Sequence, residues 1–89
     1  MRNSQCMEGY REYLKGKYFG ILNDYEKNKD FDKLLDSLLR DLIGAQEQYD
    51  SIHLVNLFAK TASLRYLKYK YFRSTIMECM KLVEVVFQE

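Results

Sequence analysis

Apolar residues recur at every third or fourth position along most of the chain, which is the spacing of one face of an α-helix. The clearest stretch follows Asp30, where an apolar stripe is backed by charged and polar residues on the other side. We predict a helix over about residues 31–43, with Asp30 as its N-cap and Gly44 directly after its end. The stripe consists of Phe31, Leu34, Leu35, Leu38, Leu39, Leu42 and Ile43.

An earlier stripe predicts a first helix over about residues 5–28. Gly16 and Gly20 lie on the side of this helix that faces away from the stripe. A glycine inside a helix destabilises it by about 0.5–1 kcal/mol relative to alanine. A face with several glycines therefore indicates that another backbone approaches this helix closely. Either a neighbouring helix packs there, or the face forms a groove for a partner. The stripe consists of Met7, Tyr10, Leu14, Tyr18, Ile21, Leu22 and Tyr25.

The last part of the chain, from about residue 51 to 88, keeps one helical phase throughout. A single helix of about 37 residues would be roughly 55 Å long, whereas a compact chain of this size is about 30 Å across. We therefore predict a break at Arg73–Thr75, where Thr75 and Glu78 have the spacing of a capping box. This gives helices over about 51–73 and 75–88; one continuous helix is the alternative. The stripe consists of Val55, Phe58, Ala59, Ala62, Tyr66, Tyr69, Phe72, Ile76, Met80, Val83 and Phe87.

A second apolar row lies on another side of the same segment. Leu57, Leu64 and Tyr71 are spaced by seven residues. A helix that is apolar on two faces is either buried on both faces or uses one of them as an interface. Both interpretations stay open: burial in the core, and a dimer or partner surface that includes Leu57 and Leu64.

The composition supports a single all-α domain over residues 1–89, a small antiparallel bundle of three to four helices. The chain has 89 residues, no proline, four glycines and 47% hydrophobic residues. Its net charge of +1 creates no strong field toward nucleic acid or membranes.

The start of the chain has no signal-peptide pattern and no apolar run is long enough to span a bilayer, so we expect a cytoplasmic protein. Two distant cysteines, Cys6 and Cys79, do not make a disulfide scaffold, and we expect free thiols with Cys79 buried.

Nothing in the sequence predicts an enzyme. The chain has one histidine, His53, and no second catalytic group at a meaningful spacing from it. There is no glycine-rich phosphate loop, no HExxH and no CxxC pattern, so we expect no catalytic residue, no metal and no cofactor.

One heptapeptide pattern, Tyr-Leu-Lys-x-Lys-Tyr-Phe, occurs twice, at residues 13–19 and 66–72. Lysines beside aromatic rings have three interpretations. The rings lie in the core with lysine stems along their edges, or the cluster binds an acidic protein, or it binds phosphates and stacks on bases. The candidate basic and aromatic contact residues are Lys15, Lys17, Arg65, Lys68, Lys70, Tyr71 and Arg73.

These patterns predict a small non-enzymatic helical protein that binds another protein, as an adaptor or inhibitor. Nucleic-acid binding through the same lysines and arginines is the alternative, and a homo-oligomeric or immunity-type bundle is the third option. In size and helical class alone, the chain is similar to bacteriocin immunity proteins and small phage-encoded inhibitors. That resemblance carries no residue over.

Overall fold

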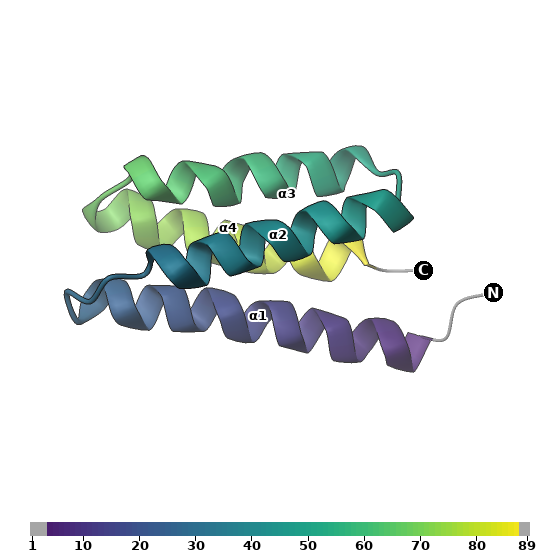
Figure 1. Ribbon diagram of the computed structural model, residues 1–89, viewed down its shortest axis with the longest axis horizontal. Helices are drawn as coiled ribbons and strands as arrows, with labels where there is room; N and C mark the ends of the chain where they lie inside the picture. Colours follow the sequence, from purple (N-terminus) through teal and green to yellow (C-terminus); the bar gives the residue numbers. More distant parts are fainter. Residues whose placement is uncertain (1–3, 88–89) are drawn as a thin grey trace.

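The computed structural model describes residues 4–87, and the side chains from residue 8 onward. Successive helices run in opposite directions and form a four-helix bundle (Figure 1). The helices are α1 (Ser4–Glu26), α2 (Asp32–Gln48), α3 (Ile52–Ser63) and α4 (Tyr69–Val86), with a 3-10 turn η1 (Leu64–Tyr66) between α3 and α4. No strand occurs between residues 4 and 87, so the predicted all-α class is confirmed.

The bundle is a rod rather than a sphere, with extents of 43 × 22 × 20 Å. The α1–α2 and α3–α4 connections lie together at one end, and the α2–α3 connection lies at the other end with the two termini (Figure 1). We call the first of these the double-loop end. No helix within the described residues is both long and apolar enough to cross a membrane.

All four helices contribute to one apolar core. The predicted stripe of α1 is confirmed in its centre, where Leu14, Tyr18 and Ile21 are fully buried. Met7 lies outside the described side chains. In α2, Leu42 is buried as predicted, whereas Ile43 is 49% exposed. Among the described residues, the fully buried apolar side chains are Leu14, Tyr18, Ile21, Leu35, Leu38, Leu42, Leu54, Leu57, Leu64, Phe72, Ile76, Cys79 and Val83.

One polar chain crosses this core. The Tyr18 hydroxyl lies 2.7 Å from the Thr61 hydroxyl, which donates to the backbone oxygen of Leu57 at 2.7 Å. The Cys79 sulfur lies 3.7 Å from the same Thr61 oxygen. Burial raises the pKa of the Cys79 thiol to about 11 and also raises the pKa of Tyr18. Cys79 is therefore a neutral, buried free thiol, as the sequence predicts; the side chain of Cys6 lies outside the described residues.

Two helix ends differ from the sequence prediction. Helix α2 continues through Gly44 to Gln48, because Ala45 is buried and extends the apolar face by another turn. Helix α1 ends at Glu26, and Asn28 just beyond it has a φ of 58°, in the left-handed region. The Lys29 N–H then donates to the Asp24 carbonyl at 2.7 Å, which closes the helix in a Schellman arrangement.

The predicted break between the last two helices is confirmed, but its predicted position at Arg73–Thr75 is wrong. Those residues lie inside α4, and Glu78 binds Lys60 of α3 at 3.2 Å instead of capping a helix. The chain reverses at Leu64–Lys68, where Leu67 and Lys68 have extended backbone. Leu64 and Phe72, on either side of this reversal, are both fully buried, and a reversal between them brings both into one core.

The displaced break also changes which face of α3 is buried. The predicted stripe holds in α4, where Phe72, Ile76 and Val83 are buried. In the first half it is wrong: Val55 is 40% exposed, and Tyr66 and Tyr69 are each 81% exposed. The reversal interrupts the helical phase, so α3 is free to turn Leu54, Leu57, Thr61 and Leu64 inward instead.

Candidate binding surface

The two copies of the heptapeptide have different surroundings. The first copy, residues 13–19, lies within α1, and both of its lysines are held by neighbouring helices. Lys15 binds Glu84 of α4 at 2.5 Å, and this hydrogen bond lowers the pKa of Glu84 and raises that of Lys15. Lys17 binds Asp41 of α2 at 2.7 Å and also contacts Ser37. Lys15 and Lys17 therefore join helices within the bundle.

The second copy, residues 66–72, lies at the double-loop end and is only partly helical. Tyr66 belongs to η1, Leu67 and Lys68 form the reversal, and α4 starts at Tyr69. The residues Tyr66, Tyr69 and Tyr71 are 81%, 81% and 62% exposed. Among the described residues, Lys68 and Lys70 have no carboxylate partner, although the Lys70 amine lies 5.4 Å from the centre of the Tyr71 ring. We call Tyr66, Lys68, Tyr69, Lys70 and Tyr71 the basic-aromatic end.

The two arginines that flank this surface are bound within the protein. Arg65 donates to Asp36 at 2.6 Å and lies 3.5 Å from Asp32. Arg73 binds Glu26 at 2.8 Å. Of the predicted basic contact residues, only Lys68 and Lys70 are therefore free of ion pairs with the side chains described, those of residues 8–87.

An aromatic group of one buried and two half-buried rings lies beneath the basic-aromatic end. The rings of Tyr25 and Phe72 stack with centroids 3.9 Å apart, and Phe31 meets the Phe72 ring edge-on at 5.1 Å. The Tyr25 hydroxyl also accepts the backbone N–H of Tyr69, which ties the start of α4 to α1. The exposed tyrosines thus extend from a rigid support.

Tyr69 has a backbone conformation that is rare for a bulky side chain. Its φ is 57°, in the left-handed region, which costs an L-residue about 1–2 kcal/mol. Strain of this kind persists only where the surroundings impose it, and it is found preferentially at functional sites. The sequence contains no signal for it, because tyrosine is not a residue that favours this region.

Replacing Tyr69 with glycine is expected to raise the free energy of unfolding by about 0.5–1 kcal/mol, because glycine adopts a positive φ without strain. Little packing is lost, since the ring is 81% exposed. Chemical denaturation followed by circular dichroism measures the change. Tyr71→Gly is the matched control: it removes an exposed tyrosine from ordinary helical backbone and is expected to destabilise by a similar amount. A Tyr69→Gly variant less stable than wild type would show that the backbone of Tyr69 is not strained.

The remaining predicted contact residues do not belong to this surface. Leu57 and Leu64 are fully buried in the core, as one of the two sequence interpretations predicts, while Tyr71 of the same row is exposed. Gly20 lies against α2, because a Cβ added there would be 3.6 Å from Leu34. Gly16 faces open space, since a Cβ added there would meet nothing within 4 Å.

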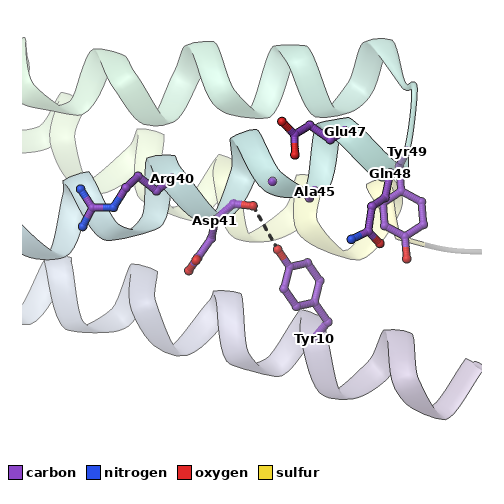
Figure 2. A pocket seen from close by; sticks show the side chains of 8 residues that line it. Tyr10, Arg40, Asp41, Ala45, Glu47, Gln48 and Tyr49 are labelled. Atoms are coloured by element: carbon purple, nitrogen blue, oxygen red, sulfur yellow. Dashed lines mark hydrogen bonds between the residues drawn. The ribbon is translucent and has the colours of Figure 1, made fainter.

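A pocket of about 440 Å³ lies between α1 and the second half of α2 (Figure 2). The Tyr10 hydroxyl projects into the gap and donates to the backbone oxygen of Asp41 at 3.3 Å. The charged groups of Arg40 and Glu47 extend away from this point and do not converge on it (Figure 2). Catalysis requires convergent groups around one reacting atom, and these lining residues do not provide them.

Known proteins give no assignment: no protein-family model matches the chain, and no curated protein and no solved structure is significantly similar to it. Within residues 4–87 no group of three or more histidine, cysteine, aspartate or glutamate side chains could hold a metal ion. The basic-aromatic end is therefore the strongest candidate site on structural grounds.

Proposed function

We propose that this protein is a small helical binding protein, an adaptor or inhibitor, that holds an acidic segment of another protein at its basic-aromatic end. The observation that carries the proposal is the exposure of Tyr66, Tyr69 and Tyr71 around Lys68 and Lys70, two lysines without a carboxylate partner among the described residues. Tyrosine is enriched in protein interfaces, where its ring contributes contact area and its hydroxyl contributes a hydrogen bond.

The start of α4 adds to the positive potential of this surface. Its first turn contains no acidic residue, and the Lys68 side chain does not cap it, so the neutral Tyr25 hydroxyl is the side-chain acceptor there. The positive end of the helix dipole therefore lies beside the two free lysines. Together these groups favour a carboxylate-bearing partner, and the stacked rings of Tyr25 and Phe72 below reduce the ordering that binding requires.

The surrounding charges support a protein partner over nucleic acid. Arg65 and Arg73 are neutralised by Asp36 and Glu26, whose carboxylates would repel a phosphate backbone. The sequence pI is about 7.7, whereas nucleic-acid-binding domains are commonly above about 9. A short acidic peptide places its charge at a few points and avoids those carboxylates.

A direct test uses a synthetic peptide of about ten residues that contains glutamate and aromatic side chains, with binding followed by fluorescence anisotropy. We expect the wild type to bind it at low salt, and the Lys68→Ala/Lys70→Ala variant to bind at least about tenfold more weakly. The matched control is Arg40→Ala/Lys81→Ala, which removes two positive charges from exposed side chains farther along α2 and α4, away from the double-loop end, and is expected to leave the affinity unchanged.

Single-stranded DNA of equal length is the competing probe. Tighter binding of DNA than of peptide, with an affinity that falls steeply with salt, would assign the surface to nucleic acid instead. Binding of neither probe by the wild type, or equal losses in the two double variants, would refute the proposed role of Lys68 and Lys70.

A further inference from the structure

Helix α3 carries an apolar row that the rest of the described structure leaves largely uncovered. Ile52 is 67% exposed and Val55 is 40% exposed. Ala59 is exposed and Ala62 is half-buried in the same row. Leu57, on the other side of α3, is fully buried. The helix thus has two apolar faces, and the bundle uses one of them.

The spacing of this exposed row is that of a helix–helix seam. Ile52, Val55, Ala59 and Ala62 follow one another at intervals of three, four and three residues. This is the a/d pattern of a coiled coil, in which side chains of one helix insert between those of a second helix. A helix face that serves only for contact with water normally carries polar residues at these positions.

The order of side-chain sizes along the row indicates which partner helix fits against it. The two branched residues, Ile52 and Val55, come first, and the two alanines follow. When a second copy of α3 lies antiparallel to the first, Ile52 faces Ala62 of the second copy, and Val55 faces its Ala59. Each layer then contains one large and one small side chain, which lets the two backbones approach closely. A two-fold axis repeats every contact, as an isologous interface requires.

The charges near the row also suit a second copy of this chain. The positions that flank it on the helix surface are Asn56, Phe58, Ser63 and Arg65, of which only Arg65 is charged. The nearest cations are already paired, Lys60 with Glu78 at 3.2 Å and Arg65 with Asp36 at 2.6 Å. Two copies would therefore bring no unpaired like charges together, whereas two basic-aromatic ends would repel each other through their free lysines.

From this self-complementary row we infer that the protein forms an antiparallel dimer through α3, on a face separate from the basic-aromatic end. Ile43 of α2 is 49% exposed and extends the same face. It lies two helical turns after Asp36, and therefore on the side of α2 from which Asp36 binds Arg65 at the end of α3. Stable interfaces bury about 800 Å² per partner, more than one short helix provides. The dimer is accordingly weak, with a dissociation constant of about 10 μM to 1 mM.

Sedimentation equilibrium over that concentration range tests the inference, with circular dichroism to confirm that each variant is folded. We expect Val55→Glu to raise the dissociation constant at least about tenfold, because it places a carboxylate in an apolar interface. Val85→Glu is the matched control: it makes the same substitution at a 50% exposed position on α4 and is expected to leave the dimer intact.

A mixing experiment tests the register. Val55→Glu and Ala59→Lys each weaken self-association, and their equimolar mixture is expected to restore dimers, since the antiparallel arrangement places the new carboxylate opposite the new amine. A wild type that remains monomeric at about 1 mM overturns the inference, as does equal weakening by Val55→Glu and Val85→Glu. Failure of the mixture to recover overturns the antiparallel arrangement. None of these outcomes depends on the acidic peptide, so the proposed function is tested separately.

Discussion

Leu64→Glu is expected to abolish the folded state. Leu64 is fully buried at the start of η1, where the chain leaves α3. An ionised carboxylate at this position would lose its water without gaining a partner, and the loss of leucine packing adds about 2–5 kcal/mol. A domain of this size has a total stability of about 5–10 kcal/mol, so the two costs together remove most or all of it. The expected measurement is loss of helical circular dichroism at 25 °C.

Val55→Glu provides the comparison for that experiment. It introduces the same charge on the neighbouring helix, at a side chain that is 40% exposed, and we expect native circular dichroism and a change in stability below about 0.5 kcal/mol. If Leu64→Glu instead keeps native circular dichroism and thermal stability, Leu64 is not part of the core. The row of Leu57, Leu64 and Tyr71 would then return as a candidate contact surface.

The contrast between these two substitutions identifies what the sequence could not determine. The buried faces of α1, α2 and α4 were largely predicted, because each has one dominant apolar stripe and a single stripe has only one side to bury. The start of α4 was not, since the helix begins at Tyr69 rather than at residue 75. Helix α3 has two rows of comparable hydrophobicity, one with Leu54 and Leu57 and one with Val55 and Ala59. Periodicity cannot choose between two such rows, because the choice depends on where the chain reverses.

The position of that reversal has no local signal. Residues 64–68 contain neither glycine nor proline, the residues that normally mark a turn. The reversal is set by packing: Leu64 and Phe72 both enter the core, and the chain between them takes an extended path with Tyr69 at a positive φ. Thr75 and Glu78 have the spacing of a capping box, which is why the sequence placed the break there. In the structure Glu78 instead forms an ion pair with Lys60.

The sequence predicted which residue types form the candidate site, but not which of the matching residues belong to it. The sequence identified Lys15, Lys17, Lys68 and Lys70 together, because the two heptapeptides are nearly identical. Only the tertiary structure separates them: carboxylates on α2 and α4 bind the first pair, and no carboxylate reaches the second pair among the described residues. Tyr66 and Tyr69 were expected in the core, since their spacing continued the stripe of α4.

Replacing the last residue of the repeated heptapeptide is expected to have a second large effect on stability, and the two copies of the heptapeptide provide a control for each other. Phe19 and Phe72 occupy the same place in the two copies, but Phe19 is 55% exposed and Phe72 is fully buried. Phe72 contacts the rings of both Tyr25 and Phe31 beneath the basic-aromatic end. Phe72→Ala removes both ring contacts and leaves a cavity, so we expect a loss of about 3–5 kcal/mol in the free energy of unfolding.

Phe19→Ala makes the same substitution at the matching position of the first copy and is expected to cost less than about 1 kcal/mol, because Phe19 is already 55% exposed. Urea denaturation of both variants measures the difference. Equal costs would contradict the different environments that the structure gives to Phe19 and Phe72. Unequal costs of the expected size mean that sequence identity between the copies reflects shared helical composition, while the reversal at residues 64–68 gives the second copy its separate role in presenting Lys68, Tyr69 and Lys70.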